Sequence, residues 1–77
     1  MKLYFSNSHG ETRLLCECDP CDVMKHIQEF CNEHGFKIYY TRRNDMTVDE
    51  KLMTVFDVGS WSEFFYTDPP MPKGANQ

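Results

Sequence analysis

The segment Tyr39-Tyr40-Thr41-Arg42-Arg43 carries the residue types best suited to holding a ligand. Planar tyrosine rings can stack on a nucleobase, and the guanidinium groups beside them can grip phosphate through paired hydrogen bonds. The segment is compact enough to serve a small nucleotide. The alternative interpretation is structural, with Tyr40 in the core and the two arginines ending an exposed strand.

A second segment, residues 57–65, combines a turn with a large aromatic side chain. Gly59 and Ser60 offer a backbone amide and a hydroxyl, and Trp61 carries an indole that is costly to expose. We expect Trp61 to stack with the tyrosines, and Gly59 with Ser60 to complete a phosphate site. The segment could equally close the core. The expected ligand-binding residues are Tyr39, Tyr40, Arg42, Arg43, Gly59, Ser60 and Trp61.

The chain has four cysteines, which are Cys16, Cys18, Cys21 and Cys31. Such crowding is typical of zinc sites, but Cys21 and Cys31 on one helix would lie about 15 Å apart, too far for one ion. A site built from Cys18, Cys21 and a histidine such as His9 or His26 stays open. The prediction is that no metal binds and that the thiols are reduced and packed in the core.

The three histidines, His9, His26 and His34, show no convergence with a serine or a cysteine that would form a nucleophilic pair. Such a pair also needs an orienting group and an oxyanion site, and the sequence indicates neither. We therefore expect a protein that is not an enzyme and that uses no cofactor.

Composition limits the class of protein further. The 77 residues, 40% of them hydrophobic, suffice for one small core and exclude a catalytic domain with a cofactor fold. The net charge of -4 argues against general binding to nucleic acid. The acidic excess lies after residue 43 and could present carboxylates to a basic groove of a protein partner. No apolar run approaches a membrane span, so we expect a cytoplasmic protein.

Periodicity predicts an α+β domain with the order ββαββ(β), an antiparallel sheet and one helix packed on one face. Asp19 as N-cap, Pro20 at the first helical position and Gly35 after the last turn delimit the helix. The predicted elements are a hairpin of strands 2–6 and 12–18, helix 20–34, strand 36–43, loop 44–51, strand 52–58, an aromatic segment 61–66, and a flexible tail 68–77 after a domain of residues 1–67. The aromatic segment is either a fifth strand or one helical turn.

One helix covers only one face of such a sheet. Alternation places Leu3, Phe5 and Leu14 on the covered face, and Tyr4, Leu15 and Tyr39 on the other. An apolar set of this size predicts a homo-oligomer with these three residues at the contact. The alternative is that the aromatic C-terminal segment folds over that face.

Several of these segments together resemble a known group of sequences. The segments are His34-Gly35-Phe36-Lys37, Tyr39-Tyr40-Thr41-Arg42, Phe56-Asp57-Val58-Gly59-Ser60 and Glu63-Phe64-Phe65. The pattern resembles a family of small uncharacterised proteins encoded by tailed phages of Gram-positive bacteria. The resemblance covers residues 1 to 67, and the four cysteines are not part of the family's pattern. The resemblance implies a setting, the host cytoplasm.

That setting in turn implies three possible roles. The first is to counter host defence by sequestering a small nucleotide immune signal. The second is to inhibit a host defence nuclease such as Cas9 through the acidic half. The third is to assist phage replication or assembly. The expected partner is therefore a small nucleotide or a host defence protein.

Overall fold

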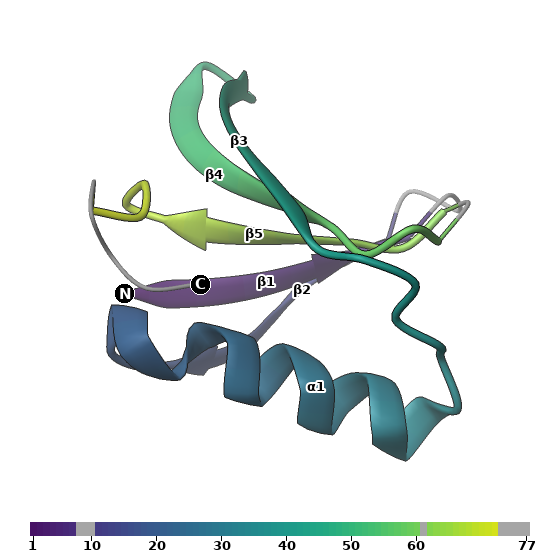
Figure 1. The fold of residues 1–77 in the computed structure, drawn as a ribbon. Coiled ribbons are helices and arrows are strands. Elements are labelled where there is room, and N and C mark those ends of the chain that lie inside the picture. The colour runs from purple at the N-terminus through teal and green to yellow at the C-terminus, as the bar shows by residue number, and fades with distance from the viewer. Residues whose placement is uncertain (8–10, 61, 73–77) are drawn as a thin grey trace.

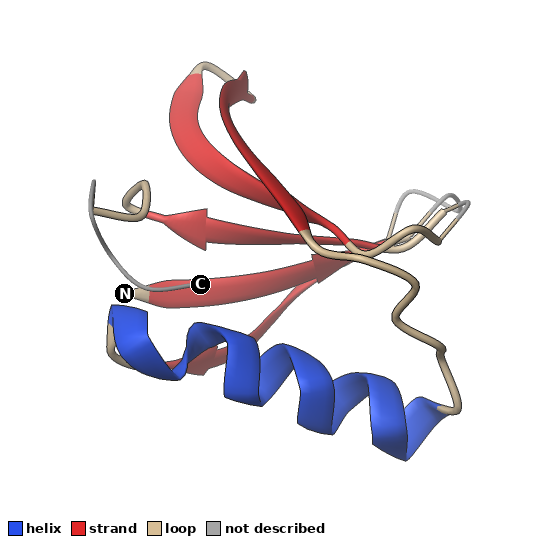
Figure 2. Ribbon diagram, viewed as in Figure 1, coloured by secondary structure: helices blue, strands red, loops and turns tan. Residues whose placement is uncertain are grey.

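The computed structural model describes residues 1–7, 11–60 and 62–72, and places one α-helix against one face of a five-stranded antiparallel sheet (Figures 1 and 2). The strand order is β2-β1-β5-β4-β3. The elements are β1 (Lys2–Ser6), β2 (Thr12–Glu17), the 3-10 turn η1 (Pro20–Asp22), α1 (Val23–His34), β3 (Arg42–Val48), β4 (Lys51–Asp57) and β5 (Phe64–Asp68). The predicted α+β class is confirmed, and the aromatic segment contributes a fifth strand.

The helix begins and ends close to the predicted residues. Pro20 opens a 3-10 turn that leads directly into α1, where the amide of Asp22 donates to the carbonyl of Asp19 at 2.9 Å. The Asp19 side chain makes no capping hydrogen bond, contrary to the prediction. At the other end Gly35 has a φ of 73°, and the Phe36 amide donates to the Cys31 carbonyl at 2.8 Å. These are the features of a Schellman motif, which agrees with the prediction that Gly35 ends the helix.

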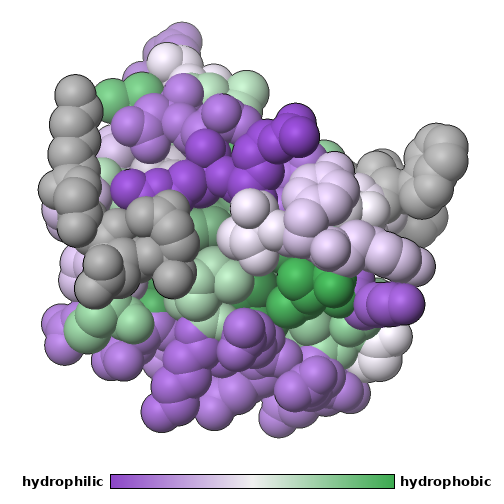
Figure 3. Space-filling model, viewed as in Figure 1, coloured by the Kyte–Doolittle hydropathy of each residue, from purple (hydrophilic) through white to green (hydrophobic). Residues whose placement is uncertain are grey.

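The core lies between α1 and the sheet, and aromatic rings fill its centre. Phe5 of β1 lies 4.7 Å from Phe30 of α1 between ring centroids, and Phe65 of β5 meets Phe30 edge-on at 5.7 Å. Ile27 and Phe56 are also buried there. Figure 3 shows the opposite, hydrophilic side of α1 along the lower edge of the molecule. Burial of this apolar stripe is what holds the helix on the sheet.

The third strand is where the sequence prediction is wrong. Residues 36–41 alternate in polarity but form no strand, and β3 instead occupies the mostly polar residues Arg42–Val48. Only residues 42 and 43 of β3 belong to the predicted strand, and residues 44–48 were predicted as a loop. Phe36 and Ile38 pack against the core from an irregular segment, which explains their spacing. β3 is an edge strand, so its backbone pairing with β4 needs no apolar face.

The chain stays packed beyond residue 67. Asp68 is the last residue of β5, and the Met71 side chain is buried. The Met71 amide donates to the Thr54 hydroxyl of β4 at 2.8 Å. This end of the core therefore includes part of the segment predicted as a flexible tail, of which residues 73–77 lie outside the described range.

A register shift in the first hairpin changes which side chains share a face. The shift lies between Leu3 and Tyr4, so Tyr4 pairs with Leu14 and Leu3 with Cys16. Leu15 is the additional residue and packs against the core, whereas Leu14 is 49% exposed. The predicted faces of Leu14 and Leu15 are therefore exchanged, as expected for a bulge in one strand of a pair.

Candidate functional site

Two segments far apart in the sequence, 36–41 and 58–60, lie side by side. The Tyr39 amide donates to the Val58 carbonyl at 3.0 Å. Gly59 has a φ of 86°, and a Cβ at this position would lie 2.8 Å from the Tyr39 Cβ and 3.1 Å from the Tyr40 Cε2. The structure thus brings together Tyr39, Tyr40 and Gly59, which the sequence analysis placed in one site.

Both tyrosine rings are available to a ligand, and each has a cation beside it. Tyr39 is 66% exposed and Tyr40 is 49% exposed, so Tyr40 is not a core residue. The Lys37 Nζ lies 5.1 Å from the Tyr39 ring centroid, and the Arg42 Cζ lies 5.6 Å from the Tyr40 centroid. These four residues, Lys37, Tyr39, Tyr40 and Arg42, are called the tyrosine–cation patch below.

A shallow open hollow of about 360 Å³ adjoins the patch. Lys37 and Tyr39 line it from segment 36–41, Gly59 and Ser60 line it from segment 58–60, and Glu63 contributes from just beyond that segment. Its volume falls at the lower end of the range for small-molecule sites. A nucleobase or a phosphate group is therefore of a suitable size for it.

Two of the donors expected to hold phosphate already have partners. The Gly59 amide donates to Asp57 Oδ1 at 2.9 Å, and the Ser60 hydroxyl donates to the Glu63 carboxylate. The Ser62 hydroxyl donates to the same carboxylate. A phosphate at this position would have to displace two carboxylates, so the cations of the patch are better suited to it than the turn is.

The remaining predicted site residues do not join the patch. Arg43 pairs with Phe56, whereas Arg42 pairs with Asp57, and neighbouring strand residues point to opposite faces. Arg43 is half-buried, and its Nη1 has no hydrogen-bond partner within the described residues. The two guanidinium groups therefore do not converge on one phosphate. Trp61, the third predicted stacking residue, lies outside the described residues.

The three residues predicted at an oligomer contact occupy different parts of the fold. Tyr4 lies on the sheet face opposite α1, directly across from Tyr66 of β5. Leu15 packs toward the core because of the bulge, and Tyr39 belongs to the tyrosine–cation patch. The open face itself has a hollow of about 370 Å³ lined by Tyr4, Tyr66 and Met53 among others. Of the predicted set, only Tyr4 can contribute to a contact there.

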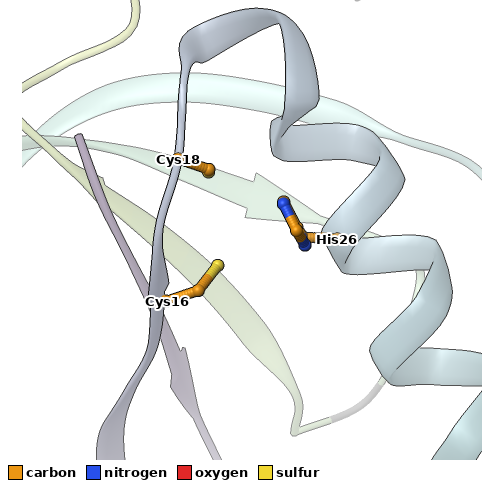
Figure 4. Close-up of side chains that lie close together, drawn as sticks. All are labelled: Cys16, Cys18 and His26. Carbon is orange, nitrogen blue, oxygen red and sulfur yellow. The ribbon is translucent and has the colours of Figure 1, made fainter.

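The structure also assembles a side-chain cluster of which the sequence analysis named Cys18 and His26 but missed Cys16. Ligand atoms of Cys16, Cys18 and His26 all lie within 4.8 Å of one another, between β2 and α1 (Figure 4). Burial, followed by the neighbouring Cys16 thiol, raises the pKa of the Cys18 thiol to about 11. Cys21, which the sequence analysis paired with Cys18, is exposed and is not in the cluster.

The Cys-X-Cys spacing was the signal available for this cluster. Residues two apart in a strand project to the same side, so Cys16 and Cys18 both face the helix that follows them. Which helical residue meets them depends on how α1 crosses β2, and the sequence does not specify that crossing. His26 meets the two cysteines because it lies in the first turns of α1, after the N-cap Asp22, on the side of the helix that faces β2.

Comparisons with known proteins do not place the chain in a family. No protein-family model matches the sequence, and searches of curated proteins and of solved structures found no match. The resemblance to phage proteins is therefore neither supported nor contradicted by them. Within the described part of the chain, no helix has the length and apolar character needed to cross a bilayer.

Proposed function

We propose that this protein binds a small nucleotide at the tyrosine–cation patch and catalyses no reaction on it. The observation that carries the proposal is the pairing of two exposed tyrosine rings, Tyr39 and Tyr40, with the cations of Lys37 and Arg42. Aromatic rings and cations can hold a ligand by stacking and by charge, without making or breaking its covalent bonds. No nucleophile with an activating base is part of the patch as defined.

The ligand's base and phosphate would contact different parts of the patch. A nucleobase stacked on a tyrosine ring gains about 1 to 3 kcal/mol and requires no particular base. Arg42, next to Tyr40 in space, offers the planar guanidinium that matches a phosphate through paired hydrogen bonds. Lys37 supplies a second positive charge beside Tyr39. The patch thus has two pairs of one ring and one cation, which match the bases and phosphates of a ligand of one or two nucleotides.

The net charge of -4 favours a small ligand over a polymer. Long nucleic acids are held mainly by many phosphate contacts, and an acidic protein repels them. The carboxylates of Asp57 and Glu63 beside the hollow add to this repulsion. In the phage setting implied by the resemblance, binding without turnover would sequester a nucleotide signal of host defence in the host cytoplasm.

The acidic inhibitor is the competing proposal, and its residues lie on another part of the protein. Asp49 and Glu50 are exposed and form the turn between β3 and β4, whereas Arg42 is at the far end of β3. Asp45 lies between them and accepts a hydrogen bond from the Thr54 hydroxyl at 2.6 Å. Because the two surfaces are separate, substitutions on one leave the other in place.

A capture experiment tests the proposal. The purified protein is incubated with a nucleotide extract from a bacterial host, washed, and heated to release bound molecules for mass spectrometry. We expect one nucleotide species at stoichiometric yield from the wild type, and strongly reduced yield from Arg42→Ala. Arg13→Ala is the matched control, since the Arg13 Cζ also lies 5.6 Å from a ring centroid, that of Phe30, away from the patch. Equal yields from the two variants would contradict the proposal.

A further inference from the structure

The Cys16, Cys18 and His26 cluster is independent of the tyrosine–cation patch and carries a separate function. We propose that these three side chains bind one zinc ion and that the ion joins β2 to α1. Figure 4 shows the two cysteines projecting from one strand segment and His26 projecting toward them from the helix. The earlier expectation of no metal was argued from Cys21 and Cys31, which are not in this cluster.

The donor set and its spacing fit zinc. Two thiolates and one imidazole are ligands that zinc prefers, and zinc sites with three protein ligands take a water or an external ligand in the fourth position. At bond lengths of about 2.0 to 2.3 Å, donors around a tetrahedral zinc lie about 3.5 to 3.8 Å apart. The donor atoms here lie within 4.8 Å of one another, so side-chain rotations that move these atoms by about 1 Å complete the tetrahedral geometry.

Glu29 orients the histidine for this role. The Glu29 Oε1 lies 3.6 Å from His26 Nδ1, one turn along α1. A carboxylate at this position favours the tautomer with the proton on Nδ1, which presents the Nε2 lone pair to a metal. Metal-bound histidines commonly have such a carboxylate partner on the other ring nitrogen.

The backbone at Cys18 is held in place although β2 ends at Glu17. The Cys18 amide donates to the Met1 carbonyl at 2.9 Å, and the Met1 amino group donates to the Cys18 carbonyl at 2.8 Å. Cys16 is held within β2 through its pairing with Leu3. Both sulfur ligands therefore come from fixed backbone, which lowers the entropy cost of binding the ion.

The location also explains what the ion would do. β2 is an edge strand whose side chains are largely exposed or half-buried, so apolar burial anchors it weakly. Domains of this size often need a metal or a disulfide in addition to their core. On binding, zinc displaces the two thiol protons to solvent, forms two Zn–S bonds and one Zn–N bond, and requires no oxidant or reductant.

Titration of the full-length protein with Zn²⁺ alone, under reductant, tests the proposal. We expect one zinc per chain and a rise in the thermal midpoint, since an ion that binds only the folded state stabilises it. Co²⁺ in its place should give the thiolate charge-transfer band and the intense visible bands of a tetrahedral site. Cys18→Ser and His26→Ala should weaken binding by more than about 100-fold, and Glu29→Gln by about 10-fold.

Cys21→Ser is the matched control, because Cys21 is a neighbouring cysteine outside the cluster, and it should bind zinc as the wild type does. Arg42→Ala should also bind zinc normally, which separates this proposal from the nucleotide site. The proposal is overturned if the reduced wild type takes up no stoichiometric zinc. It is equally overturned if Cys21→Ser loses as much affinity as Cys18→Ser.

Discussion

Gly59 and Tyr39 lie so close together that a side chain at Gly59 has no room: an added Cβ would sit 2.8 Å from the Tyr39 Cβ. The same glycine has a φ of 86°, in the region that other residues rarely adopt. The positions of Tyr39 and Tyr40 therefore require a residue without a side chain at position 59.

Gly59→Ala should consequently displace the segment that carries Tyr39. We expect the free energy of unfolding to fall by about 2 kcal/mol or more, from the left-handed backbone together with the steric clash. Gly35→Ala is the matched control, with a φ of 73° but no atom of the described residues within 4 Å of the added Cβ, and should cost only about 1 kcal/mol. Urea unfolding of both variants measures the difference, and equal losses would show that the close approach is unimportant.

The turn between β3 and β4 should be open to stabilisation. Asp49 and Glu50 have φ values of 51° and 65°, and they connect the paired residues Val48 and Lys51 as a two-residue hairpin loop. Such loops favour glycine at the second position. Glu50→Gly should raise the free energy of unfolding by about 1 kcal/mol. Glu50→Gln still places a residue with a side chain in the left-handed region but removes the charge. An equal rise in the free energy of unfolding of that variant would show that the effect comes from the charge and not from the backbone.

The Cys31 thiol should resist alkylation while the protein is folded. Burial, and then the negative charge of Glu63, raises its pKa above the ordinary value of 9.0. The protonated thiol is therefore favoured by folding, and the stability it contributes is lost as the pH rises above about 9. At pH 8 iodoacetamide should modify exposed Cys21 first and Cys31 last, as read by mass spectrometry. Equal rates in the folded protein would contradict this burial, whereas equal rates in urea are expected.

Self-association through the open sheet face remains a prediction, with a changed set of residues. Leu14 pairs with Tyr4 on that face and is 49% exposed, so light scattering should give at least twice the 9.1 kDa chain mass. Leu14→Lys should return the protein to a monomer. Leu52→Lys is the matched control, since Leu52 is 53% exposed on the other face and should leave the assembly intact. A wild-type mass near 9.1 kDa would sink this prediction.

The helix could be predicted from the sequence because its signals are local. Pro20 and Gly35 lie at its two ends, and the apolar spacing between them is decided within a few turns. β3 could not be predicted in the same way. Its residues are mostly polar, and only pairing with β4, across a two-residue turn without glycine, makes Arg42–Val48 a strand.

The candidate sites show the same difference between features that are local in the sequence and features that depend on tertiary structure. Tyr39, Tyr40 and Arg42 are neighbours in sequence, so their types alone suggested a common patch. Arg42 and Arg43 point to opposite faces because they are neighbours within β3, which begins at residue 42, six residues later than predicted. The exchange of Leu14 and Leu15 required a bulge, and the meeting of Cys16 and Cys18 with His26 required the crossing of α1 over β2. These are tertiary features that no local pattern specifies.

The most direct test of the central claim is the affinity of the captured nucleotide, measured by isothermal titration calorimetry for three variants. Arg42→Ala removes a charge-assisted contact and should weaken binding roughly 10- to 150-fold, about 1.5 to 3 kcal/mol. Arg13→Ala and Asp49→Lys should bind as the wild type does, because neither residue belongs to the patch. An unchanged affinity in Arg42→Ala would contradict the nucleotide site. If Asp49→Lys also fails to protect phage from host defence in an infection assay, the acidic inhibitor is favoured instead.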